Sequence, residues 1–163
     1  MRVFIIDLET FVVDRVKFDY PIDVRFCCVR CGICCGDTSR KLRHVLLLES
    51  EANELASRTG LEVSEFSYNV HAKVPYEYEM KKSQEGKCVF LRNSMCAVYE
   101  FRPLICRFYP FELKSENGKT IFSFTDECPG LGEGKNLSQV YFKTLFRQAQ
   151  IRLGSVRSST GTH

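Results

Sequence analysis

The chain has 163 residues, of which 44% are hydrophobic and 26% charged, and these values are typical of one globular domain. Its net charge of +3 is too small to indicate nucleic-acid binding by itself. No stretch reaches the roughly 20 apolar residues that a membrane-spanning helix needs. Acidic residues interrupt the apolar N-terminus before a signal sequence could form. We therefore expect a cytoplasmic protein with no membrane association.

In chain order, residues 1–19 mix apolar and acidic positions without a clear period, so both strands and a short helix fit them. Residues 20–26 read as extended. Residues 50–59 are predicted to form a helix that Ser50 caps and Gly60 ends. A short second helix is expected over residues 64–70.

Two hairpins follow. Residues 88–98 are predicted to turn at Asn93 and Ser94. Asn117-Gly118 is the preferred pair for a two-residue type I′ turn, and it sets Leu113 opposite Phe122 and Phe111 opposite Phe124. Between the hairpins, Pro103 and Pro110 punctuate a short helical turn and an extended exit.

A closing helix is expected over residues 137–153, with Gly154 as its stop. These elements predict a small α+β domain, with hairpins and loops around a metal site and helices packed alongside. We divide the chain into an N-terminal extension (1–19), a cysteine-cluster metal-binding domain (20–153) and a flexible tail (154–163).

The nine cysteines are the most informative residues. Cytoplasmic thiols stay reduced, and an odd number cannot all pair in disulfides, although a disulfide framework stays open for a hyperthermophile source. Cys28, Cys31 and Cys34 follow one another at two-residue gaps, and Cys35 comes next. This spacing lets one loop aim several thiolates at a metal, as in zinc sites and in ferredoxin cluster loops.

Later cysteines complete the set. With Cys28, Cys31, Cys34 and Cys35, the candidate metal ligands are Cys88, Cys96, Cys106 and Cys128. Eight thiolates suffice for two four-thiolate sites, and zinc and iron–sulfur clusters both suit them. The Asn117-Gly118 hairpin is expected to bring Cys106 and Cys128 side by side. Neighbouring Cys34 and Cys35 are expected to point in different directions and to serve two centres, or one of them to lie behind the ligands. Cys27 is surplus.

The segments "FCCVRCGICC", "KCVFLRNSMCAVYEFRPLICRFYPF" and "TDECPGLGEG" resemble the YkgJ-like cysteine-cluster (CxxCxxCC) family of zinc- or iron-chelating proteins, often labelled Fe–S oxidoreductases. The likeness covers roughly residues 20–135, and the family's signature cysteines correspond to the eight named above. Its "RPLICR" element matches Arg102 and Arg107, which we expect beside the cofactor. Cys27 departs from the family pattern.

The resemblance implies a zinc or iron–sulfur cofactor and a redox enzyme or electron carrier with an unidentified redox or protein partner. A structural zinc module that binds protein or RNA is the alternative, with the basic stretch from Arg40 to His44 as its contact, but the chain has no recognisable nucleic-acid motif. A part in protein lysine methylation, as in a related flagellin methylase, is a more distant one. The sequence names no catalytic residue.

Overall fold

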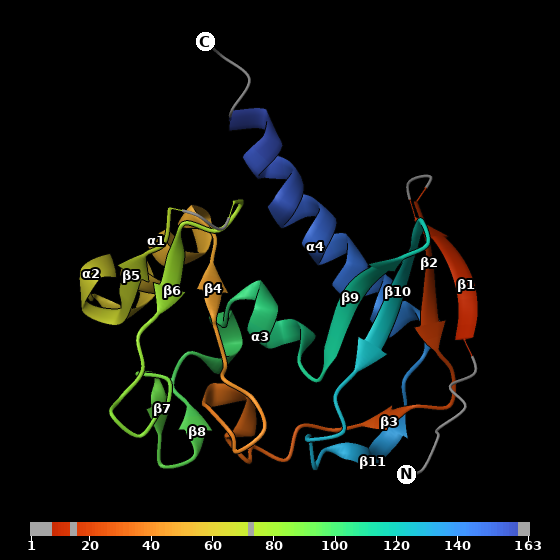
Figure 1. Ribbon diagram of the computed structural model, residues 1–163, viewed down its shortest axis with the longest axis horizontal. Helices are drawn as coiled ribbons and strands as arrows, with labels where there is room; N and C mark the ends of the chain where they lie inside the picture. The colour runs from red at the N-terminus through yellow and green to blue at the C-terminus, as the bar shows by residue number, and fades with distance from the viewer. Residues whose placement is uncertain (1–7, 14–15, 72–73, 160–163) are drawn as a thin grey trace. The chain divides into compact units, whose positions relative to one another are not determined.

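The structure is a computed structural model that describes residues 8–13, 16–71 and 74–159 (Figure 1). The strands are β1 (Leu8–Val13), β2 (Val16–Pro21), β3 (Arg25–Phe26), β4 (Leu46–Leu47), β5 (Ser67–Asn69), β6 (Tyr78–Met80), β7 (Leu91–Arg92), β8 (Met95–Cys96), β9 (Phe111–Glu116), β10 (Lys119–Phe124) and β11 (Leu131–Asn136). The helices are α1 (Glu49–Thr59), α2 (Val63–Phe66), α3 (Leu104–Phe108) and α4 (Gln139–Ser159), with 3-10 turns η1 (Ile33–Cys35) and η2 (Tyr99–Phe101). The predicted α+β class is confirmed.

The chain divides into two compact units. Unit 1 consists of Met1–Val29 and Phe108–Ser155, and unit 2 consists of Arg30–Arg107 and Val156–His163. Each unit is described by itself below. The division into an extension, a cysteine-cluster domain and a tail stays a prediction, and residues 1–7 and 160–163 of those segments lie outside the described residues. Within the described part of the chain, no helix is both long and apolar enough to span a membrane.

Unit 1 is built on a sheet with the strand order β1-β2-β10-β9. The β9–β10 hairpin turns at Asn117 (φ 51°) and Gly118 (φ 75°), and positive φ at both positions is the type I′ signature. The predicted register is confirmed, since Phe122 lies opposite Leu113 and Phe124 opposite Phe111. Antiparallel β1 joins the sheet through β2, which pairs in parallel with β10.

Aromatic side chains form the core of unit 1 between this sheet and α4, which runs alongside β9 and β10 (Figure 1). The Phe142 ring is fully buried, and its centroid lies 5.1 Å from that of Phe111 and 5.2 Å from that of Phe122. One turn further along α4, the Phe146 ring stacks on Phe18 at 4.6 Å. The spacing of four residues therefore places one aromatic face of α4 on the sheet.

The predicted C-terminal boundary of this last helix is wrong. Residues 137–153 were expected to be helical, but α4 begins at Gln139 and continues through Gly154 to Ser159. Gly154 does not have a positive φ, so it does not form a left-handed helix cap. A glycine inside a helix costs only about 1 kcal/mol relative to alanine, which weakens the helix without ending it.

Unit 2 has a hydrophobic core of its own. It joins α1 and α2 to the three-stranded sheet β4-β6-β5 and to the segment around β7 and β8. The buried residues of this core are Leu47, Ala52, Leu55, Phe66, Met80, Phe90 and Val98. Two cysteines of unit 2, Cys88 and Cys96, pack against this core.

Helix α1 begins and ends by different means. Gly60 ends it as predicted, with φ 73° and an N–H that donates to the Ala56 carbonyl at 2.9 Å. The predicted cap at Ser50 is wrong, because Leu48 is the N-cap residue and Ser50 lies inside the first turn. Glu51 accepts the Leu48 N–H instead, at 3.1 Å. The Glu51 carboxylate, and not the Ser50 hydroxyl, therefore accepts a backbone N–H at the positively polarised start of the helix.

The remaining local predictions are largely confirmed. The β7–β8 hairpin turns at Asn93 and Ser94, which both have positive φ. The predicted helix over 64–70 is shorter, since α2 spans Val63–Phe66 and the next residues form β5. The described part of residues 1–19 is strand rather than helix.

Candidate metal centre

Two of the candidate ligands, Cys34 and Cys35, lie in the turn η1. Gly32 precedes it with φ 73°, a left-handed conformation that suits glycine, and the Cys35 N–H donates back to the Gly32 carbonyl at 3.0 Å. The Cys34 and Cys35 side chains are half-buried, and their sulfur atoms lie 3.8 Å apart. The expectation that these neighbouring thiols point in different directions is therefore wrong.

This separation has a direct chemical meaning. In a tetrahedral site with Zn–S bonds of about 2.3 Å, any two ligand sulfurs lie about 3.8 Å apart. Each thiolate of a cubane iron–sulfur cluster binds a different iron, so its ligand sulfurs lie much farther from one another. The separation of Cys34 and Cys35 is that of a hydrogen bond between two thiols, and it also fits two thiolates bound to one metal ion.

Cys96, on strand β8, interacts with both thiols of this pair. Hydrogen bonding with Cys35 lowers the pKa of Cys34 to about 7 and that of Cys96 to about 6. Hydrogen bonds with Cys34 and Cys96 raise the pKa of Cys35, so Cys35 is the thiol of the three that stays protonated. The thiols of Cys34, Cys35 and Cys96 thus interact with one another within unit 2.

Cys88 and Cys106 lie within electrostatic reach of the same group. Burial raises the pKa of Cys88, and the charges of Cys96 and Cys34 add to this effect. The pKa of Cys106, which lies on α3, is raised strongly by burial and next by the charges of Cys88, Cys34 and Cys96. Cys88 and Cys106 thus lie close enough to Cys34 and Cys96 for their charges to affect one another.

Backbone hydrogen bonds hold the first cysteine turn against the later cysteine segment. The Cys88 N–H donates to the Cys35 carbonyl at 2.6 Å, and the Asp37 N–H donates to the Gly86 carbonyl at 2.9 Å. Gly36 and Lys87 form an antiparallel bridge between these two hydrogen bonds. Cysteines that are more than 50 residues apart in sequence thus lie side by side within unit 2.

Arginine side chains supply positive charge near the thiols. Arg43 contributes to the lowered pKa of Cys34, and Arg102 contributes to that of Cys96, in both cases as minor causes. The Arg102 guanidinium lies 3.9 Å from the centroid of the Tyr99 ring and donates to the Tyr99 carbonyl at 2.7 Å. Arg107 Nε donates to the Arg102 carbonyl at 2.8 Å. This hydrogen bond joins Arg107 to the backbone of Arg102 and not to a cysteine.

The other predicted ligands are placed differently. Cys28 and Cys31 are exposed, as is the surplus Cys27. Cys128 is buried in unit 1, whereas Cys106 belongs to unit 2, so their expected meeting stays a prediction. In the described part of the chain, no three Cys, His, Asp or Glu side chains stand together in position to hold a metal ion. The eight-cysteine ligand set and the roles of Arg102 and Arg107 stay predictions.

Some residues around the thiols were not singled out by sequence reasoning. Glu51 is buried, and its carboxylate accepts the Leu104 N–H at 2.7 Å at the start of α3, two residues before Cys106. Asp37 pairs with Lys82 across the cysteine turn. Glu51 gives no local signal beyond a glutamate in a helical first turn. Asp37 stands out only as the one acidic residue between Arg25 and His44.

Comparisons with known proteins place the cysteine segments in a family. The family model described as "CxxCxxCC: Putative zinc- or iron-chelating domain" matches residues 27–129. The uncharacterized protein MJ0661 of Methanocaldococcus jannaschii is 28% identical over 151 residues, covering 79% of this chain and 71% of the relative. MJ0939, an uncharacterized protein of the same organism, is 24% identical over 115 residues, covering 66% of this chain and 37% of the relative.

No solved structure matches the chain. The family match covers more than half of the sequence and includes the cysteine turn and all the later cysteines. It supports metal binding, with zinc or iron as the metal. The chain belongs to the CxxCxxCC family of zinc- or iron-chelating domains.

Proposed function

We propose that a metal ion gathers Cys34, Cys35 and Cys96 of unit 2 into one site, with Cys88 or Cys106 as the fourth ligand, and that the ion is iron in an electron-transfer protein. The 3.8 Å separation of the Cys34 and Cys35 sulfurs carries the proposal, because it fits two thiolates on one ion. Iron held by thiolates supplies one-electron chemistry between its ferric and ferrous states.

The hydrophobic core of unit 2 favours a chemical rather than a folding role for the metal. Modules that depend on zinc to fold are usually too small to bury a core. Unit 2 instead buries seven residues between α1, α2 and its sheet. Most of the stability of unit 2 is therefore expected to come from this core. The metal would then serve a redox role and would not be needed for folding.

The partial exposure of the cysteines supports a role in electron transfer. Cys34, Cys88 and Cys96 are half-buried rather than fully enclosed. Arg43 and Arg102 contribute positive charge on the side of Cys34 and Cys96. Positive charge near a thiolate centre stabilises its reduced, more negative form, and this tunes the potential. The partner would be a redox protein or enzyme that exchanges one electron.

Structural zinc is the second candidate, favoured by the same sulfur separation, which equals the edge of a tetrahedral zinc–thiolate site. In that case the domain would present a surface to a protein partner. The two candidates differ in colour, magnetism and redox activity, so one preparation separates them.

The experiment is anaerobic purification followed by elemental analysis and electron paramagnetic resonance. Iron near one equivalent, with visible absorption that bleaches on reduction and a high-spin ferric signal, supports electron transfer. Colourless protein with one equivalent of zinc and no iron contradicts it and supports the structural role. Expression in iron-supplemented and zinc-supplemented media controls for the metal supply.

A further inference from the structure

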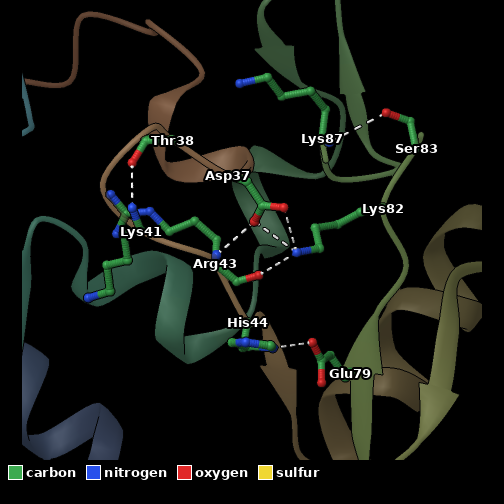
Figure 2. A network of polar contacts seen from close by, with 9 residues as sticks. All are labelled: Asp37, Thr38, Lys41, Arg43, His44, Glu79, Lys82, Ser83 and Lys87. Atoms are coloured by element: carbon green, nitrogen blue, oxygen red, sulfur yellow. Dashed lines mark hydrogen bonds and ion pairs between the residues drawn. The ribbon is translucent and has the colours of Figure 1, made fainter. Parts of the chain in front are cut away.

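Asp37 and Lys82 form an ion pair across the segments that carry the candidate ligands (Figure 2). Lys82 Nζ lies 2.8 Å from Asp37 Oδ1 and 3.0 Å from Oδ2, so it contacts both carboxylate oxygens. About a quarter of each side chain is exposed, 23% for Asp37 and 26% for Lys82. An ion pair that is partly withdrawn from water is screened less than one on the open surface.

The ion pair also forms hydrogen bonds with the backbone of Arg43. The Arg43 N–H donates to Asp37 Oδ1 at 2.8 Å, and Lys82 Nζ donates to the Arg43 carbonyl at 3.1 Å. Figure 2 shows the Asp37 carboxylate between these two partners. The three residues therefore close a ring of contacts from segments that lie up to 45 residues apart in sequence.

This ring lies beside the cysteines on both segments. Asp37 follows Cys35 by two residues, and Lys82 forms an antiparallel bridge with Cys88. The Cys88 N–H donates to the Cys35 carbonyl at 2.6 Å, so the ion pair and this hydrogen bond join the same two segments. Loss of the ion pair would leave the backbone contacts alone to hold Cys35 near Cys88.

Two glycines show how closely the segments approach. A Cβ on Gly36 would lie 2.9 Å from the Gly86 carbonyl oxygen, and a Cβ on Gly86 would lie 2.7 Å from Asp37 Oδ2. Real Cβ atoms essentially never approach so closely, so neither position has room for a side chain unless the neighbouring atoms move. The absence of a side chain at Gly86 thus leaves room for the Asp37 carboxylate between the two segments.

We propose that the Asp37–Lys82 ion pair is the positioning device of the metal centre, which holds the Cys34–Cys35 turn next to the segment that carries Cys88. The inference rests on the proposed metal site in unit 2. Through the Arg43 backbone, the pair also fixes the segment whose guanidinium lies near Cys34. Asp37 and Lys82 do not bind the metal themselves.

The test measures binding of Co²⁺ and Zn²⁺ to the full metal-free chain in the wild type, Asp37→Asn and Lys82→Met. Asparagine keeps an oxygen for the Arg43 N–H and loses the charge that faces Lys82. Residues that hold metal ligands in place typically cost 10–100-fold in affinity when replaced. We expect each variant to bind about 10-fold more weakly, with weakened sulfur-to-cobalt charge-transfer absorption.

Three further variants separate positioning from general stability. Lys114→Met removes a more exposed lysine–carboxylate contact, 3.0 Å from Glu112 on β9 in unit 1, and should leave the cobalt spectrum and affinity unchanged. Lys82→Arg keeps the positive charge and should recover most of the affinity. Asp37→Asn and Lys82→Met remove the same ion pair. The double variant Asp37→Asn/Lys82→Met should therefore have no lower metal affinity than the single variant with the lower affinity.

Circular dichroism of the metal-free proteins establishes that each variant is folded. If Asp37→Asn does not fold, the comparison of Lys82→Met with Lys82→Arg decides. Wild-type affinity and an unchanged cobalt spectrum in folded Asp37→Asn or Lys82→Met would overturn the inference and leave the proposed metal site intact. A wild-type chain that binds neither metal would overturn the proposed function and, with it, this inference.

Discussion

The sulfur atoms of Cys34 and Cys35 lie 3.8 Å apart, although the two residues are neighbours in the chain. The turn η1 and the glycines on either side of it allow both side chains to face the same point. Cys96 joins them from a hairpin 61 residues further on, through a hydrogen bond with Cys35. The close approach of Cys34 and Cys35 is thus formed locally, and Cys96 joins them through tertiary structure.

Replacement of the pair should abolish stoichiometric metal binding. Cys34→Ser and Cys35→Ser each remove one thiolate from the proposed ion, and serine is a poor ligand for zinc or iron at neutral pH. We expect at least about 100-fold weaker Zn²⁺ binding in competition with a chromophoric chelator. Cys27→Ser is the matched control, because Cys27 is exposed and stands outside the cluster. Equal losses in all three variants would contradict the assignment.

Glu51 is expected to matter for stability more than any exposed glutamate on its helix. It is 2% exposed and accepts the N–H groups of Leu48 at 3.1 Å and Leu104 at 2.7 Å. Glu51→Ala leaves both donors buried without this acceptor, at about 1–3 kcal/mol each. We expect the free energy of unfolding to fall by about 2–4 kcal/mol in urea titrations. Glu54→Ala, on the same helix, should change it by less than about 1 kcal/mol.

Gly86 and Gly60 allow backbone strain to be separated from steric overlap. Both have positive φ, 72° and 73°, but a Cβ on Gly60 meets nothing within 4 Å. Gly60→Ala should therefore cost only the left-handed strain, about 1–2 kcal/mol. Gly86→Ala adds a contact of 2.7 Å with the Asp37 carboxylate. It should destabilise the protein more and weaken Co²⁺ binding, whereas Gly60→Ala should leave the cobalt affinity unchanged.

Phe142 anchors α4 to the sheet of unit 1. Its fully buried ring packs against those of Tyr20, Phe111 and Phe122. Phe142→Ala should lower the free energy of unfolding by about 3–5 kcal/mol, because a large cavity remains where the ring was. Val140→Ala, which is 67% exposed on the same helix, should change it by less than about 0.5 kcal/mol. Similar losses in both variants would show that α4 does not pack as described.

Local chemistry explains what the sequence could predict. The Asn117-Gly118 turn and the Gly60 cap depend on residues that favour positive φ, and both are where the sequence places them. The end of α4 was mistaken because Gly154 lowers helix stability without forbidding the helix. The Ser50 cap failed for a related reason: the buried Glu51 carboxylate serves two N–H groups at once.

The centre was only partly predictable. Cysteine spacing indicated metal, but the shared direction of Cys34 and Cys35 depends on the η1 backbone, which spacing alone does not specify. The Asp37–Lys82 pair joins residues 45 positions apart, and no local pattern links them. The parallel pairing of β2 with β10 is equally non-local. Such contacts emerge only when the chain folds.

X-ray absorption at the metal edge of anaerobically purified protein tests the central claim most directly. A single ion held by thiolates predicts a first shell of four sulfurs at about 2.3 Å and no second metal nearby. A first shell dominated by nitrogen or oxygen, or a short metal–metal distance from a cluster, would contradict it.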